Sequence, residues 1–289
     1  GKTTTTYLVE HIADVAGKST GVIGTVGVRI AGKTEHAERT TPESCDLQEL
    51  FARMRDAKAD VVAMEVSSHA LDLDRVYGSQ FAVTAFSNLT QDHLDYHKTF
   101  EAYFEAKALL FSNRYPARRV ICIDDTWGRE LLKRCARAGD HVISTGFAPD
   151  AQIHPVSVEY APTHTHVTLD VRGTAYTFDY PLVGRFNVAN MMLAFGIALE
   201  LGIPVGIIVR ALETVPQIPG RLERVHTAHE GGVSVFVDYA HTPDALIKAL
   251  SAVKSLSEGR TIVVFGCGGD RDTSKRALMG KAALEADVA

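Results

Sequence analysis

The chain has 289 residues, 46% hydrophobic and 22% charged, which is ordinary for a globular protein long enough to form two domains. Its formal net charge of −5 gives no electrostatic reason to expect nucleic acid or an anionic membrane as a partner. No apolar run approaches the roughly 20 residues of a membrane span, and the cysteines show no C-x-x-C spacing, which favours reduced thiols in a cytosolic protein.

The first residues, Gly-Lys-Thr-Thr at 1–4, match the end of the phosphate-binding pattern G-x-x-x-x-G-K-[ST]. In such a loop backbone N–H groups surround the phosphates, the lysine reaches the β- and γ-oxygens, and the hydroxyl binds Mg²⁺. Apolar residues recur near helical spacing from Tyr7 to Ala16, so the motif stands at the start of a helix. Because the first half of the pattern is absent, we expect the chain to be a piece of a longer protein.

Apolar runs alternate with helical segments in the first half of the chain, at 21–27, 59–66, 81–89 and 118–124. Runs that are apolar on both faces favour strands of a parallel sheet covered by helices. The alternating pattern from about 151 to 180 predicts a small antiparallel hairpin region. Helices are predicted again at 187–201 and 204–215.

A change of domain is predicted at 216–220, where two prolines and a glycine occur in five residues. Beyond it a strand at 233–240, a helix from about 244, a strand at 261–269 and a helix from about 274 restart the β-α-β pattern. The predicted fold class is therefore α/β. A phosphate-loop central domain with a mostly parallel sheet (1–218) is followed by a partial, Rossmann-like C-terminal domain (219–289).

Polar clusters follow several predicted strands, where open parallel sheets bind their ligands. Glu65 closes an apolar strand and could bind Mg²⁺ directly or through water, or it could be a plain strand-end residue beside a capping serine. The loop at 88–97 carries two histidines and two aspartates. These side chains could be metal ligands or solvated loop residues, and their spacing does not decide between the two.

Other candidates are weaker on the residues alone. Lys107 lies in a predicted helix at 100–111, where an ordinary lysine is a solvated partner of nearby glutamates. The glycine-rich turn at 266–272 could approach a phosphate or carboxylate. Asp238 could accept hydrogen bonds from ribose hydroxyls, and His241 could bind nucleotide or serve local packing.

Taken in order, a series of segments across almost the whole chain resembles the Mur ligases of peptidoglycan synthesis, and within them the type that adds the third amino acid of the stem peptide. The segments are GKTTTT (1–6), TTPES (40–44), MEVSSHAL (64–71), NLTQDHLDYH (88–97), EAYFEAKALLF (101–111), GRFNVAN (184–190), PGRLERV (219–225), VDYAHTPDAL (237–246) and GCGGDRD (266–272). Each segment alone is weak evidence for the family, but the set of segments in this order is specific to it.

The resemblance implies an ATP- and Mg²⁺-dependent amide ligase. ATP would phosphorylate the carboxylate of UDP-MurNAc-L-Ala-D-Glu, and the amine of a diamino acid would attack the acyl-phosphate. The resemblance favours meso-2,6-diaminopimelate over L-lysine as the acceptor, but no residue of the chain decides between them. It also implies a cytoplasmic, monomeric enzyme without nucleic-acid partners or membrane insertion.

The resemblance also implies roles for single residues. Catalytic roles would belong to Lys2, Lys107 and His93. ATP would contact Gly1, Lys2, Thr3, Thr4, Asn187, Asn190, Arg221, Asp238 and His241. Metal ligands would be Thr3, Glu65, His93 and Lys107, the lysine as its carbamate. The nucleotide-sugar peptide would contact Thr40, Thr41, Ser67 and Arg75.

The chain departs from the family pattern at a few positions. Leu73 stands where a glutamine commonly touches the nucleotide-sugar, and Ala277 replaces a usual proline. The segment that recognises the diamino acid would lie beyond Ala289, so we expect the chain alone to be inactive. The alternatives are a folylpolyglutamate-synthase-like ligase, a phosphate-loop NTPase that couples hydrolysis to motion, and a non-catalytic regulator that kept the fold.

Overall fold

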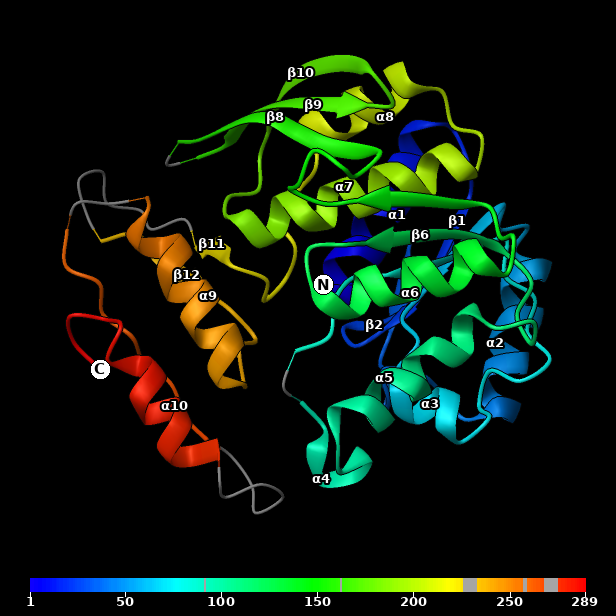
Figure 1. The fold of residues 1–289 in the computed structure, drawn as a ribbon, viewed down its shortest axis with the longest axis horizontal. Helices are drawn as coiled ribbons and strands as arrows, with labels where there is room; N and C mark the ends of the chain where they lie inside the picture. The colour runs from blue at the N-terminus through cyan, green and yellow to red at the C-terminus, as the bar shows by residue number, and fades with distance from the viewer. Residues whose placement is uncertain (91, 162, 226–232, 257–258, 268–274) are drawn as a thin grey trace.

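Helices cover both faces of two neighbouring β-sheets in the larger part of the molecule (Figure 1). The structure is a computed structural model, and it describes residues 1–90, 92–161, 163–225, 233–256, 259–267 and 275–289. In each sheet the strands nearest the other sheet run parallel, and antiparallel strands lie toward the opposite edge. The predicted α/β class is confirmed.

The first sheet has the strand order β3-β2-β1-β4. Its strands are β1 (Thr20–Gly24), β2 (Gly27–Ile30), β3 (Lys33–Glu35) and β4 (Val61–Met64). Only β1 and β4 are parallel, because β1, β2 and β3 form consecutive antiparallel pairs. The prediction of one strand over 21–27 is wrong: the chain reverses between Gly24 and Gly27, and the latter has φ 148°, which favours glycine.

The second sheet has the order β10-β9-β8-β7-β6-β5. Its strands are β5 (Val83–Phe86), β6 (Arg118–Cys122), β7 (Val142–Thr145), β8 (Ile153–Tyr160), β9 (Thr165–Val171) and β10 (Thr174–Tyr180). Strands β5, β6 and β7 are parallel, and β8 to β10 form the predicted antiparallel region. Strand β8 also pairs with β7, so the hairpins extend the parallel sheet.

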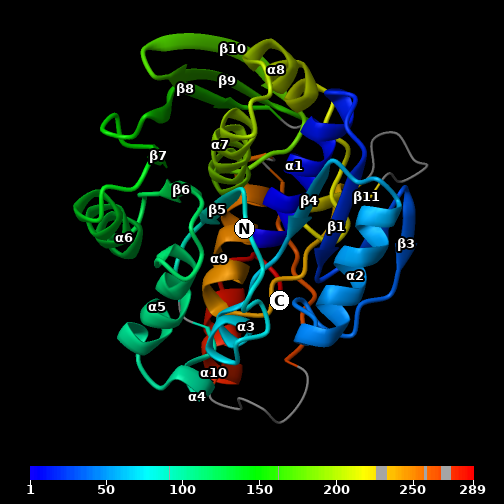
Figure 2. The same ribbon diagram turned by 90° about the vertical axis from the view of Figure 1, so that its right-hand side faces the viewer.

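Two layers of helices enclose these sheets. One layer consists of α1 (Lys2–Val15), α7 (Arg185–Glu200) and α8 (Val205–Glu213). The other contains α2 (Ser44–Asp56), α3 (Ser68–Asp72), α4 (Leu94–His97), α5 (Phe100–Ala108) with the 3₁₀ turn η1 (Leu109–Phe111), and α6 (Thr126–Arg137). Each layer has its own apolar core against the sheets. Figure 2 shows β1–β3 with α2 on one side and β8–β10 with α8 on the other.

Strand β4 is less buried than the sequence predicts, since Val62 is 37% exposed. The two sheets are not hydrogen-bonded to each other, and a cavity of about 640 Å³ lies between β4 and β5. Helices α1 and α7 also line this cavity, through residues such as Val9 and Leu193. The expectation of burial on both faces is therefore wrong for β4, because a cavity takes the place of a neighbouring strand.

The described residues from 220 onward form a smaller unit beside the first (Figure 1). In it β11 (Glu223–Val225) pairs antiparallel with β12 (Val235–Val237), and α9 (Pro243–Lys254) packs against α10 (Lys275–Ala283). The strand predicted at 261–269 is not formed over 261–267, where the structure shows an isolated bridge from Ile262 to Val288, and its last residues lie outside the described ones.

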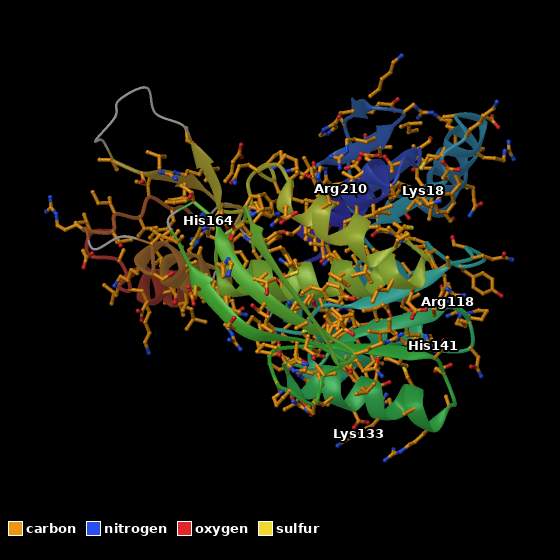
Figure 3. All side chains as sticks on the ribbon, turned by 90° about the horizontal axis from the view of Figure 1, so that it is seen from above. Lys18, Arg118, Lys133, His141, His164 and Arg210 are labelled. Atoms are coloured by element: carbon orange, nitrogen blue, oxygen red, sulfur yellow. The ribbon has the colours of Figure 1, made fainter. Side chains whose placement is uncertain are left out.

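A buried carboxylate fixes the far end of α7, away from the carboxyl ends of the parallel strands. Glu200 is 8% exposed, and its Oε1 lies 2.8 Å from His141 Nε2 and 3.8 Å from Arg172. Arg118 lies 3.6 Å from its other oxygen, and Figure 3 shows Arg118 and His141 near one another. These charges anchor the helix to β6 and β7. Within the described part of the chain, no helix is both long and apolar enough to cross a membrane.

Candidate functional site

The first turn of α1 lies at the carboxyl ends of the parallel strands. The Thr5 N–H donates to the Gly1 carbonyl at 2.9 Å, so the helix begins within the Gly-Lys-Thr motif as predicted. A methyl group on Gly1 would come within 3.1 Å of Ser87, which follows β5, and 3.2 Å of Asn190 Oδ1 in α7. Three separate parts of the chain therefore meet at a helix N-terminus, where backbone N–H groups favour an anion.

The smaller unit contributes an arginine to this point. Arg221 donates from Nη2 to Thr3 Oγ1 at 2.8 Å, across 218 positions of sequence. Its Nε is buried without a hydrogen-bond partner among the described residues, and its guanidinium lies 5.2 Å from the Tyr239 ring centroid. Asp238 Oδ2 accepts the Leu222 N–H at 2.7 Å, which fixes the backbone beside this arginine. A guanidinium with a spare donor next to a phosphate-loop lysine suits a bound phosphate.

Two asparagines of α7 face the same region from its first turns. Asn187 is 1% exposed, and its Nδ2 donates to the Val183 carbonyl at 2.9 Å. Its Oδ1 is buried and has no partner within the described part of the chain. A buried polar atom without a partner is costly, so Asn187 offers a ready acceptor for a donor such as the amino group of a purine.

Glu65 follows β4 and is 2% exposed. Its carboxylate accepts the Thr25 N–H at 2.8 Å and the Thr25 hydroxyl at 3.2 Å. The space for this carboxylate depends on Gly24, because a methyl group built on Gly24 would overlap Glu65 Oε1. The glycine at this position thus leaves room for a buried carboxylate.

Replacing Gly24 with alanine is expected to displace the Glu65 carboxylate and break its bonds to Thr25, lowering the free energy of unfolding by about 1–3 kcal/mol. Urea denaturation measures the change. Gly206→Ala in α8 is the matched control, because its new methyl group meets no atom within 4 Å. Equal stability of the Gly24 variant and the control would contradict this account of the Glu65 site.

The residues predicted to contact the nucleotide-sugar peptide form one network around the end of β4. Thr41 is 1% exposed; its hydroxyl donates to the Glu65 carbonyl at 2.9 Å and accepts the Ser67 N–H at 3.0 Å. Arg75 reaches the Thr41 carbonyl at 3.3 Å, and Thr40 Oγ1 lies 3.0 Å from Thr25 Oγ1. The Thr41 hydroxyl thus makes its hydrogen bonds within this network. Thr40, Ser67 and Arg75 are partly exposed.

His93 begins the short helix α4 with φ 54°, a left-handed conformation that is uncommon for residues other than glycine. Burial lowers the pKa of His93 to about 4, although the neighbouring Asp92 opposes the shift. Its Nε2 lies 3.3 Å from Asp92 Oδ2. A histidine that stays neutral at pH 7 keeps a lone pair for a metal ion.

Lys107 projects from α5 toward Tyr103, with Nζ 4.9 Å from the ring centroid. Burial and the nearby Lys2 lower the pKa of Lys107 to about 7, against the raising effect of Asp92 and Asp125. The uncharged amine is therefore accessible near neutral pH. The neutral form is the one that can add CO₂ and become a carbamate.

The lowered pKa has a consequence for stability. Between about pH 7 and 10.5 the unfolded chain holds a proton on Lys107 that the folded chain does not, so wild-type stability rises with pH across this window. We expect Lys107→Met to stabilise the protein most below pH 7, with the gain disappearing above pH 10.5. Urea denaturation in CO₂-free buffers at several pH values measures this gain. The exposed Lys133 (Figure 3) is the control, and a gain independent of pH would contradict the prediction.

Some predicted site residues are not shown to be accessible from the site at the start of α1. Thr4 is 3% exposed inside α1, and His241 is exposed, with Nδ1 3.0 Å from the Tyr239 carbonyl. Most of the glycine-rich turn at 266–272 lies outside the described residues. Among those that are described, no group of three or more His, Cys, Asp or Glu side chains is arranged to hold a metal ion.

Sequence reasoning did not single out two residues of the centre, Asp125 and Ser87. Asp125 caps α6 by accepting the Gly128 N–H at 2.6 Å, and its Oδ2 accepts the Leu89 N–H at 2.9 Å. It also raises the pKa of Lys107. The sequence did contain a signal for Asp125, because it follows the buried strand β6. The carboxyl ends of parallel strands share one edge of a sheet, where ligands bind. Ser87 lies at the equivalent end of β5.

The family model of the Mur ligase middle domain matches residues 1–198, and that of the Mur ligase glutamate ligase domain matches 220–289. A UDP-N-acetylmuramoyl-L-alanyl-D-glutamate--2,6-diaminopimelate ligase from Gloeobacter violaceus is 46% identical over 99% of this chain and 57% of its own length. One from Clostridium botulinum is 42% identical over 97% of this chain and 57% of its own length. The chain thus spans little more than half the length of these curated relatives.

Solved structures show the same fold. A diaminopimelate ligase of the same name has a TM-score of 0.76 and 32% identity, covering 99% of this chain and 58% of its own. A folylpolyglutamate synthetase from Lactobacillus casei has a TM-score of 0.70 at 15% identity, over 98% of this chain and 74% of its own, which shows likeness of fold alone. With two family models in order along its length and relatives 42–46% identical over almost all of it, the chain belongs to the Mur ligase family.

Proposed function

We propose that the chain provides the ATP site and part of the substrate site of a ligase that joins 2,6-diaminopimelate to UDP-N-acetylmuramoyl-L-alanyl-D-glutamate in peptidoglycan synthesis. The observation that carries the proposal is the 46% identity, over almost the whole chain, to a relative whose name states those substrates. The geometry supports it, because a helix N-terminus, a lysine, an arginine and a buried carboxylate meet at one place.

In the proposed reaction a carboxylate oxygen of the D-glutamate attacks the γ-phosphorus of ATP, the bond to the bridging oxygen breaks, and ADP leaves. The diaminopimelate amine then attacks the acyl carbon, loses a proton, and displaces inorganic phosphate. The first step brings two anions together and the second releases an anion, so fixed cations contribute most. We assign this role to Lys2, the N–H groups of α1 and Arg221.

Further contacts are assigned by position. Asn187 and Asn190 would address the adenine side of ATP from α7, and Asp238 would address the ribose. Thr40, Ser67 and Arg75 would contact the nucleotide-sugar peptide, with Thr41 supporting them. Thr4 and His241 would lie at the margins of the ATP site. We propose that the boundary between the central and C-terminal domains lies at 218/219, within the proline-rich segment before Arg221.

Thr3, Glu65 and a carbamate on Lys107 fit a magnesium ion by their chemistry, because Mg²⁺ prefers oxygen ligands. Thr3 and Glu65 would hold one ion beside the phosphates. His93 and Lys107 would serve a second position, the lysine after its neutral amine adds CO₂ and releases a proton. When bound, Mg²⁺ neutralises phosphate charge. The protein's own contribution is to exclude water from Lys107 and to keep His93 unprotonated.

The test measures phosphate release by an extended protein, defined as this chain flanked by the segments of the Gloeobacter violaceus relative that lie outside the match. The reaction contains ATP, Mg²⁺ and UDP-MurNAc-L-Ala-D-Glu, with either meso-diaminopimelate or L-lysine. We expect release that requires the nucleotide-sugar and meso-diaminopimelate. The Gloeobacter violaceus enzyme is the control.

Three other outcomes would redirect the assignment. Release only with L-lysine would change the acceptor. Release with a folate and glutamate would favour the folylpolyglutamate-type reaction. Release without any acceptor would favour a plain NTPase. If the control enzyme is active and the extended protein releases phosphate with neither diamino acid, the proposal is wrong.

A further inference from the structure

A single helical turn carries His93, one of the residues assigned to metal binding. Helix α4 has four residues, and the backbone is left-handed at both ends, with φ 54° at His93 and 68° at Lys98. One turn of helix is not stable by itself in water, because the free-energy cost of nucleation exceeds the stabilisation from its few hydrogen bonds. Left-handed conformations of ordinary residues add to that cost. Contacts outside the turn must therefore fix its position.

His97, the last residue of α4, makes the most buried of these contacts. Its Nε2 lies 2.9 Å from Ser68 Oγ, in the first turn of α3. Its ring stacks on Tyr103 of α5, with centroids 5.0 Å apart and planes inclined by 20°. His97, Ser68 and Tyr103 are 8%, 3% and 5% exposed. Helices α3, α4 and α5 lie side by side in both ribbon views (Figures 1 and 2).

The same stack continues toward the proposed metal ligands. The face of the Tyr103 ring meets Lys107 Nζ at 4.9 Å, and the ring lies 6.1 Å from the His93 ring in an edge-on arrangement. His69 of α3 closes the cluster, with its ring centroid 4.8 Å from that of His93. His97 is thus the residue that touches α3 through a hydrogen bond and α5 through a ring stack, while belonging to the turn that carries His93.

We propose that His97 is a positioning residue. It holds α4 between α3 and α5, and so sets the separation of His93 from Lys107 without touching substrate or metal. The inference rests on the metal-binding roles in the proposed function. A partner one shell away from metal ligands typically contributes 10- to 100-fold in metal affinity or activity.

The main variant is His97→Ala, which removes both contacts. In the extended protein we expect a roughly 10- to 100-fold fall in kcat and a similar rise in the Mg²⁺ concentration for half-maximal rate, with KM for ATP changed by less than about threefold. Mn²⁺ binding, followed by electron paramagnetic resonance with a non-hydrolysable ATP analogue, is expected to weaken by the same factor. His164→Ala, whose side chain is 42% exposed just before β9 (Figure 3), should match wild type.

Two further variants separate the contacts and guard against loss of fold. His97→Phe keeps the ring stack and loses the hydrogen bond, and His97→Gln keeps an Nε2 donor for Ser68 and loses the ring. We expect each to recover part of the Mn²⁺ affinity lost in His97→Ala. If the alanine variant does not fold, these two decide the question.

Unchanged metal dependence in folded His97 variants would overturn the inference, whatever happens to kcat. Failure of the proposed function looks different. In that case wild type shows no ligation beside an active Gloeobacter violaceus control, while Mn²⁺ binding still reports on His97. Absence of Mn²⁺ binding by wild type would overturn both the metal site and the positioning role.

Discussion

Replacing Lys2 with methionine is expected to lower the ligation rate of the extended protein by about 10²- to 10³-fold. Lys2 opens α1, and the Arg221 guanidinium reaches the neighbouring Thr3 at 2.8 Å. A cation at this point stabilises the charge that develops on the transferred phosphoryl group, which methionine of similar length cannot do. Steady-state phosphate release with both substrates at saturation measures the effect.

The control for Lys2 is Lys18→Met. Lys18 follows the same helix at its other end and is exposed (Figure 3). Its replacement makes the same chemical change far from the site, and we expect the rate to stay within about twofold. If the Lys2 variant has a rate near that of wild type, Lys2 does not act as the phosphate-loop lysine.

Lys107→Ala is expected to lower the rate by at least about 100-fold. The reason is its proposed conversion to an anion, which starts from an amine whose pKa burial has lowered to about 7. If the anion is what matters, a small carboxylate that enters the vacated space can replace it. We therefore expect acetate to restore part of the rate, and acetamide of the same size to restore none.

Two controls accompany the Lys107 experiment. Lys133→Ala should respond to neither additive, since Lys133 is exposed on α6. Wild-type protein in buffer stripped of CO₂ should lose activity and regain it when bicarbonate is added. Equal recovery with acetate and acetamide would show that the lysine acts by filling space and not through a carbamate.

Local signals in the sequence predicted much of the architecture. The Gly-Lys-Thr motif predicted the start of α1, and the alternation over 151–180 predicted the hairpins β8 to β10. The helix over 100–111 was also predicted, although it ends as a 3₁₀ turn after Ala108. These features depend on period and on breaker residues within a few positions, which is the information that one sequence contains.

Pairing between strands was harder to predict. The run GVIGTVG reads as one apolar strand, but Gly24 and Gly27 bracket a reversal that makes two. Strand β4 reads as fully buried, yet its exposure depends on what lies beside it, and a cavity separates it from β5. Neither outcome is encoded in local periodicity, because both depend on the partner across the sheet.

Sequence motifs named candidate site residues, but they did not predict the contacts between those residues. Nothing in spacing joins Arg221 to Thr3, which are 218 residues apart. Tyr103 of α5 is 5% exposed, as a residue on a buried helix face is, and its ring also faces Lys107 and His97. Asp125 and Ser87 needed the sheet order before their position beside the site could be known.

The most direct test of the ligase assignment follows oxygen atoms. UDP-MurNAc-L-Ala-D-Glu labelled with ¹⁸O in the reacting carboxylate is turned over by the extended protein with ATP, Mg²⁺ and meso-diaminopimelate. Mass spectrometry then reads the released phosphate. An acyl-phosphate requires one carboxylate oxygen to leave with the phosphoryl group, so we predict one ¹⁸O in each phosphate formed with product. Unlabelled phosphate would contradict the account, because it would mean that ATP is hydrolysed by water.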